Sequence, residues 1–169
     1  MSAEIGKLLA NLVGSADAIV APPRGVPVPA APDGLPLDLR RFFELCGGVS
    51  LFPDSDYPAR IVGPDELVQT NCLLLPGQEE EALHDPSMER SWHWYSVVSD
   101  EKGDYISIDL SPRRLGQCYD SARDTYAIRG QSPIIATTFT DLLKRLVANR
   151  GEYWYWLRSE FVGMGDAYD

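Results

Sequence analysis

The chain lacks most of the features that indicate a particular chemistry or compartment. Its 169 residues include three cysteines, Cys46, Cys72 and Cys118, and their wide spacing argues against a disulfide framework and a zinc site. No apolar run reaches the ~18 residues that cross a bilayer. The amphipathic start, with Glu4 and Lys7, is unlike a signal peptide. These absences predict a reduced, cytoplasmic protein with no membrane partner.

Motifs for catalysis are also missing. The chain has no glycine-rich phosphate loop and no serine with the flanking glycines of a nucleophile elbow. The only histidines, His84 and His93, are not spaced as a zinc-ligand pair. Asp54 and Asp56 could begin a calcium loop, but the residues after them do not supply its glycine. We therefore predict no cofactor, no metal and no enzymatic activity.

Carboxylates at strand ends leave a catalytic alternative open. Asp104, Asp109 and Asp120 end or begin predicted strands, where acidic side chains commonly hydrogen-bond with their own turns. Two of them could act as an acid and a base if the fold brings them together. The structural role is the preferred interpretation. Cys118, inside a predicted strand, is interpreted as a small core residue rather than a nucleophile.

Negative charge is what the sequence has in excess. Twenty-five acidic and fifteen basic side chains give a formal net charge of −10. Such a surface repels phosphate backbones, which argues against a nucleic-acid partner. It also speeds the encounter with a basic protein. Because negative charge equally favours solubility, composition alone leaves both interpretations open.

The length and the 44% hydrophobic content fit one domain with a substantial core, covering residues 1–169. Residues 1–18 hold an amphipathic helix. Residues 19–34 carry five prolines and are expected to form an extended strap or loop. Residues 35–147 form the predicted core, and the aromatic extension at residues 148–169 is expected to pack back on it.

Residues 35–52, LPLDLRRFFELCGGVSLF, predict a helix that turns sharply into a strand. Apolar residues, Phe42 among them, recur at helical spacing and form one face. Gly47 is placed to take the left-handed conformation that ends a helix, and Gly48 allows a tight turn. A strand over residues 59–62 and a helix over residues 63–71 should follow.

The centre of the chain has the two-residue period of strands. Ile106 and Ile108 alternate with polar residues, and the turn SDEKG joins residues 103–110 to a strand over residues 92–98. Further strands are predicted over residues 117–120, 125–128 and 134–136. Thr138 can cap a closing helix whose buried stripe includes Leu143. The pattern predicts an α+β fold with an antiparallel sheet flanked by helices.

The order of these motifs resembles that of the SUKH superfamily. The similarity rests on the helix, diglycine and strand of residues 35–52, on GDYISIDL at 103–110, GQCYD at 116–120 and IIATTFTDLLKRLV at 134–147. The proline-rich segment and the aromatic extension are not part of the family core. Most members of this superfamily are bacterial immunity proteins of polymorphic toxin systems, and one branch contains a fungal cell-wall regulator.

The resemblance implies a non-catalytic immunity protein that neutralises a cognate toxin by covering its functional surface. Many toxins in such systems are nucleases, whose basic grooves an acidic inhibitor could fill. The alternative that the resemblance leaves open is a regulatory scaffold similar to the fungal relatives. Neither interpretation specifies the oligomeric state or the toxin.

An acidic and aromatic stretch over residues 78–94 is the predicted partner-binding surface. The acidic side chains would steer a basic partner, and two tryptophans on one strand face would anchor it. Aromatic residues are equally the bulkiest core residues, so that role remains open for each. The predicted partner-binding residues are Glu79, Glu80, Glu81, Asp85, Trp92 and Trp94.

Overall fold

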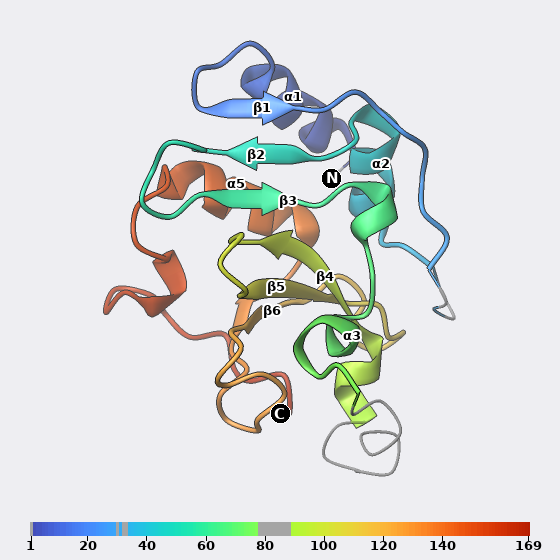
Figure 1. Ribbon diagram of the computed structural model, residues 1–169, viewed down its shortest axis with the longest axis vertical. Coiled ribbons are helices and arrows are strands. Elements are labelled where there is room, and N and C mark those ends of the chain that lie inside the picture. Colours follow the sequence, from blue (N-terminus) through green and yellow to red (C-terminus); the bar gives the residue numbers. More distant parts are fainter. Residues whose placement is uncertain (1, 30, 32–33, 78–88) are drawn as a thin grey trace.

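The structure is built on one antiparallel sheet. A computed structural model describes residues 2–29, 31, 34–77 and 89–169 (Figure 1). Within them, seven strands are hydrogen-bonded in chain order. The strands are β1 (Ala18–Val20), β2 (Val49–Leu51), β3 (Ala59–Ile61), β4 (Trp94–Ser99), β5 (Tyr105–Asp109), β6 (Cys118–Ser121) and β7 (Ile134–Ala136). The predicted single-domain α+β fold with an antiparallel sheet is confirmed.

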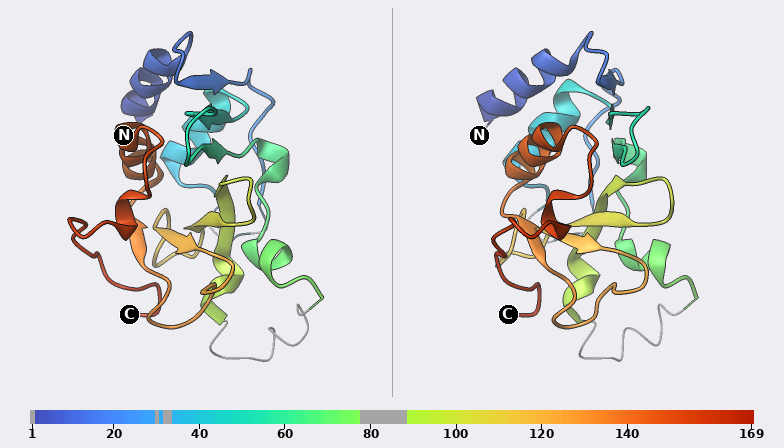
Figure 2. Two further views of the ribbon diagram at one scale, coloured as in Figure 1. Left: turned by 60° about the vertical axis from the view of Figure 1, so that its left-hand side comes forward. Right: turned by 90° about the vertical axis from the view of Figure 1, so that its left-hand side faces the viewer.

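Three helices gather on one side of the sheet (Figure 2). They are α1 (Ser2–Leu12), α2 (Leu37–Leu45) and α5 (Phe139–Asn149), and each contacts the other two. The rings of Phe42 and Phe139, both fully buried, lie 5.0 Å apart between α2 and α5. Leu143 is also fully buried, so the predicted apolar stripes are confirmed. No helix in the described segments is long and apolar enough to cross a membrane.

Strand β5 has the predicted alternation of apolar and polar residues, but both of its faces are buried. Ile106 and Ile108 are 3% and 0% exposed and lie opposite Val98 and Tyr95 of β4. Ser107, on the other face, is equally buried and shares hydrogen bonds with two hydroxyl groups, those of Thr70 and Ser121. The second face of the sheet is therefore buried at β5, where the hydroxyl groups of Thr70, Ser107 and Ser121 bond to one another.

A buried carboxylate joins the beginnings of α2 and α5. Asp38 is 3% exposed, and its Oδ2 accepts hydrogen bonds from the backbone N and the hydroxyl of Thr140, at 2.8 and 2.9 Å. Thr138 caps α5 as predicted, because its hydroxyl accepts a hydrogen bond from the backbone N of Asp141. The sequence identified the cap, but the Asp38 contact joins distant segments and was not predicted.

The corner after α2 corrects one prediction. Gly48 has a φ of +124°, whereas Gly47 does not adopt the left-handed conformation, and α2 ends instead at an extended Cys46. Gly47 is needed for space, because a Cβ atom there would lie 2.3 Å from the carbonyl oxygen of Pro22. The proline-rich strap crosses at this point, and its first residues form the edge strand β1.

Three further predictions about secondary structure are wrong. The helix expected over residues 63–71 is divided into a 3-10 turn (Pro64–Glu66) and α3 (Thr70–Leu74), since the carbonyl of Val68 accepts a hydrogen bond from the backbone N of Ser96. Residues 125–128 form turns rather than a strand, with Ala127 at a φ of +57°. Residues 89–93 form a 3-10 helix, so the strand expected over residues 92–98 begins at Trp94.

Candidate partner-binding site

The structure describes only two of the six predicted partner-binding residues, Trp92 and Trp94. Glu79, Glu80, Glu81 and Asp85 lie outside the described residues. The two tryptophans do not share a strand face, because Trp92 is half-buried in the 3-10 helix and Trp94 is in β4 with an exposure of 0%. A fully buried side chain cannot anchor a partner, so the prediction for Trp94 is corrected.

Trp94 is instead the centre of a second core. Its ring lies 4.8 Å from that of Tyr119 and 5.8 Å from those of Tyr126 and Tyr168. Tyr119 donates a hydrogen bond of 2.8 Å to Asp109, which is 1% exposed. The structural interpretation of Asp109 therefore holds, and this aromatic group serves packing.

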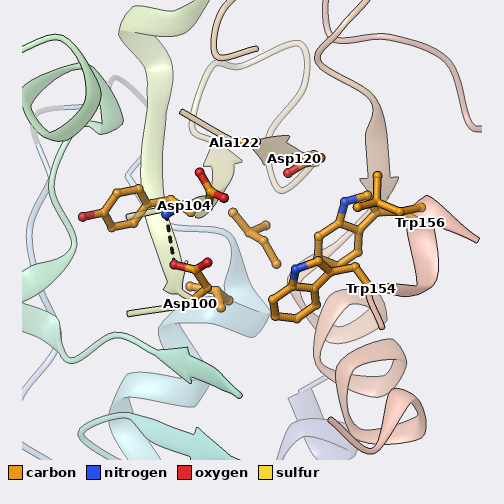
Figure 3. Close-up of a pocket in the computed structure, with 10 residues that line it drawn as sticks. Asp100, Asp104, Asp120, Ala122, Trp154 and Trp156 are labelled. Atoms are coloured by element: carbon orange, nitrogen blue, oxygen red, sulfur yellow. Dashed lines mark hydrogen bonds between the residues drawn. The ribbon is translucent and has the colours of Figure 1, made fainter. Parts of the chain in front are cut away.

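A different combination of acidic and aromatic residues lines a cavity of about 70 Å³ (Figure 3). Its walls come from β4, the β4–β5 turn, β5, the end of β6, and the C-terminal extension around the 3-10 turn Tyr155–Leu157. The lining residues are Val98, Asp100, Asp104, Tyr105, Ile106, Asp120, Ala122, Trp154, Trp156 and Leu157. We call this cavity the acidic–aromatic pocket.

Two stacked indoles form one wall of the pocket. The rings of Trp154 and Trp156 lie 4.9 Å apart and within 18° of parallel. Arg150 and Gly151 both have positive φ angles, and such residues end a helix and reverse the chain. Trp156 is then 8% exposed within the main core, and the hydroxyl of Tyr155 donates a hydrogen bond of 2.8 Å to the carbonyl of Ile135. The extension thus packs back on the body, as predicted.

Acidic side chains form the opposite wall. Asp100 Oδ1 accepts hydrogen bonds from the backbone N atoms of Lys102, Gly103 and Asp104, at 2.7 to 3.0 Å. Asp104 Oδ1 accepts one of 2.8 Å from the backbone N of Arg123. Asp100 is therefore held in place by the backbone of its own turn, and Asp104 by the backbone of the segment after β6. Among the ion pairs of the described residues, none includes an aspartate of this pocket.

Asp120 is the most perturbed of these carboxyl groups. Burial raises its pKa to about 6, and the negative charge of Asp104 adds to the rise. The indole N–H of Trp156 approaches Asp120 and opposes the rise (Figure 3), although the two do not form a hydrogen bond of ordinary geometry. At neutral pH the pocket therefore holds a carboxylate that lacks full solvation.

The fold brings Asp104 and Asp120, two of the three carboxylates considered for acid–base chemistry, into one pocket. The rest of the lining contains no histidine, cysteine, serine or lysine. The described residues contain no group of three or more ligands arranged to hold a metal ion. Cys118 is fully buried with a raised pKa, as expected of a core thiol. Carboxylates beside aromatic rings are suited to an organic cation.

Two of the segments that line this pocket are distinct in the sequence, the turn SDEKG and the tail YWYWLRSEF, but the sequence does not indicate that they lie together. No periodicity in either segment indicates that Trp154 and Trp156 lie beside Asp100 and Asp120. A signal that was available is the density of tryptophan after a predicted helix end, which already indicated a packed extension.

Comparison with known proteins identifies the family. No established family profile matches the chain. Immunity protein YokJ of Bacillus subtilis (strain 168) is 40% identical to it over 165 residues, which is 98% of this chain and 96% of the relative. Identity at this level over nearly the full length of both proteins indicates common descent and a shared fold. The chain therefore belongs to the family of immunity protein YokJ.

Proposed function

We propose that this protein is a non-catalytic immunity protein that binds a cognate bacterial toxin and neutralises it by covering its functional surface. The observation that carries the proposal is the nearly full-length relationship to immunity protein YokJ. The order of sequence motifs, which resembles that of the SUKH superfamily, supports the same assignment. Membership of that superfamily is part of the proposal and rests on the order of the motifs.

Charge and chemistry agree with inhibition by contact. A net charge of −10 favours a basic partner, and a nuclease with a cationic substrate groove is the toxin class that fits best. The acidic–aromatic pocket contains no nucleophile or general base apart from its aspartates. All three cysteines are free, which agrees with a cytoplasmic site of action.

The test is a titration of a candidate cognate toxin, such as the product of a toxin-type reading frame found directly upstream of this gene, with the purified protein. An inhibitor that acts by occlusion should abolish toxin activity at one equivalent, with a linear decrease before that point. An enzyme that modifies the toxin would protect at substoichiometric amounts, and more so with time. Either time-dependent protection or no protection at several equivalents would contradict the proposal.

Cell rescue provides the second measurement. Cells that express the toxin should grow when this protein is co-expressed and should not grow with a truncated chain. Size-exclusion chromatography of the mixture should show a complex, and its mass gives the stoichiometry. A salt-dependent association rate would indicate that opposite charges steer the encounter.

A further inference from the structure

The size of the acidic–aromatic pocket limits what it can hold. Its volume is about 70 Å³, whereas sites for whole small molecules are typically ~300–1,000 Å³. A single water needs only ~10–15 Å³ on the same kind of measure. The pocket is therefore too small for a metabolite and large enough for the end of one side chain.

The charge of the pocket selects a cation. Asp100, Asp104 and Asp120 line it without a cationic residue among the lining side chains. Two basic groups of the surrounding turns have other contacts. Lys102 Nζ donates a hydrogen bond of 3.3 Å to the carbonyl of Asp56 and lies 5.9 Å from the ring centre of Tyr57, and the guanidinium of Arg123 packs against Gly103. Since a group of carboxylates near one another is unfavourable without compensation, a cation from outside would relieve their repulsion.

A buried donor lies beside the same carboxylate. Trp156 is 8% exposed, and its indole N–H approaches Asp120 without completing a hydrogen bond of ordinary geometry (Figure 3). Buried donors in folded proteins nearly always have a partner, and an incomplete contact calls for an explanation. A cation bound by Asp120 would hold this carboxylate in place beside the indole N–H.

The aromatic wall distinguishes between the two basic side chains. Guanidinium is planar, stacks on indole faces and forms paired hydrogen bonds with carboxylates, whereas ammonium is compact and strongly hydrated. Trp154 and Trp156 supply the aromatic surface, and the aspartates supply acceptors. We propose that the acidic–aromatic pocket is a guanidinium-binding site that takes an arginine side chain of a protein partner. That this partner is the toxin rests on the proposed function.

The surroundings of the pocket fit a protein partner. Leu157, which lines the pocket, is 49% exposed, and Tyr153, which is 47% exposed, packs against Tyr57 of a neighbouring hollow. This hollow of about 170 Å³ shares Asp100, Asp104 and Trp154 with the pocket, and its other lining residues are Tyr57, Pro58 and Lys102. An arginine in a small pocket surrounded by exposed aromatic and aliphatic groups is a typical arrangement at the centre of protein interfaces. The hollow gives room for the chain that carries the arginine.

The first test uses a small probe and the full chain. The ¹⁵N-labelled protein is titrated with Nα-acetyl-arginine methylamide while the four indole N–H signals are followed. The signals of Trp154 and Trp156 should shift and saturate at about millimolar concentration, as expected for one side chain. Those of Trp92 and Trp94, which do not line the pocket, should not move.

Matched probes and variants make the titration decisive. The citrulline analogue has the same shape without the charge and should cause no shift, and the lysine analogue should bind more weakly than arginine. Asp120→Asn should weaken arginine binding about tenfold, the effect of losing one charge-assisted contact. Asp54→Asn removes an equal charge from an exposed residue outside the pocket and should have no effect. Equal shifts with arginine and citrulline, or no shift of Trp154 and Trp156, would overturn the proposal.

The second test uses the toxin. Asp120→Asn and Trp154→Phe should each weaken toxin binding about tenfold or more, while Asp54→Asn leaves it unchanged. Thermal unfolding of each variant verifies that it is folded. If both pocket variants bind the toxin as the wild type does, the pocket does not take a toxin arginine and the inference is wrong. If the wild type does not neutralise the toxin, the proposed function fails instead, and the probe titration still decides whether the pocket binds guanidinium.

Discussion

Asp120→Asn should stabilise the folded protein at neutral pH. Burial raises the pKa of this carboxyl from an ordinary 3.8 to about 6. One pKa unit corresponds to about 1.4 kcal/mol, so ionisation of Asp120 in the folded state costs up to ~3 kcal/mol relative to the unfolded chain. Asparagine has the same shape and no charge to desolvate. We therefore expect a gain of ~1–3 kcal/mol in the free energy of unfolding at pH 7.5.

The sign of the effect depends on pH in a defined way. Because the pKa is raised by folding, the folded chain binds a proton more tightly than the unfolded chain does. The cost is absent below about pH 4, where both states are protonated, and is fully present above about pH 6. Urea denaturation of the wild type and the variant at pH 7.5 and pH 4 measures it. The two proteins should differ at pH 7.5 and converge at pH 4.

The control is Asp54→Asn, an exposed position outside the pocket. Its free energy of unfolding should stay within ~0.5 kcal/mol of the wild type at both pH values. An Asp120→Asn variant that is no more stable than the wild type at pH 7.5 would refute the reasoning. An advantage that persists unchanged at pH 4 would also refute it, because it could not come from ionisation.

Three further predictions concern the core and the binding surface. Phe42→Ala and Leu143→Ala should each lower the free energy of unfolding by ~2–5 kcal/mol, since both side chains are fully buried; an unchanged urea midpoint would contradict the packing of α2 and α5. Thr140→Val should cost ~1–2 kcal/mol because Asp38 loses its hydroxyl donor, and the same change at exposed Thr137 serves as its control. Reversal of residues 79–81 to lysine should slow toxin association and reduce its salt dependence without unfolding the protein; unchanged kinetics at low salt would remove this stretch from the interface.

Features that depend on neighbouring residues were determined by the sequence alone. The buried stripes of α2 and α5 and the Thr138 cap are set within a helical turn or two. The alternation at Ile106 and Ile108 is set by the two-residue period of a strand. These patterns were sufficient for the α+β fold and its antiparallel sheet, because strands that are joined by short turns pair with their neighbours in the sequence.

Predictions failed where distant segments determine local structure. Tryptophan is a residue type that is common at protein interfaces, and Trp94 was predicted to bind a partner. Tyrosines from three other segments surround its ring, however, so it is a core residue. Val68 lies within the helix that the sequence predicts, but it is not helical in the structure, and its carbonyl accepts a hydrogen bond from the backbone N of Ser96. In each case a long-range contact overrides a local preference, and single-sequence patterns contain no information about that contact.

The acidic–aromatic pocket was decided entirely by the tertiary structure. The sequence provides Asp100, Asp104 and Asp120 around strand ends and provides Trp154 and Trp156 in the tail. Only the reversal at Arg150 and Gly151, followed by burial of Trp156 against the core, brings the two groups together. Burial then changes the chemistry as well as the position, since removal of water is what raises the pKa of Asp120. The aspartates and the two indole rings come together, and Asp120 loses part of its hydration, only when the chain folds.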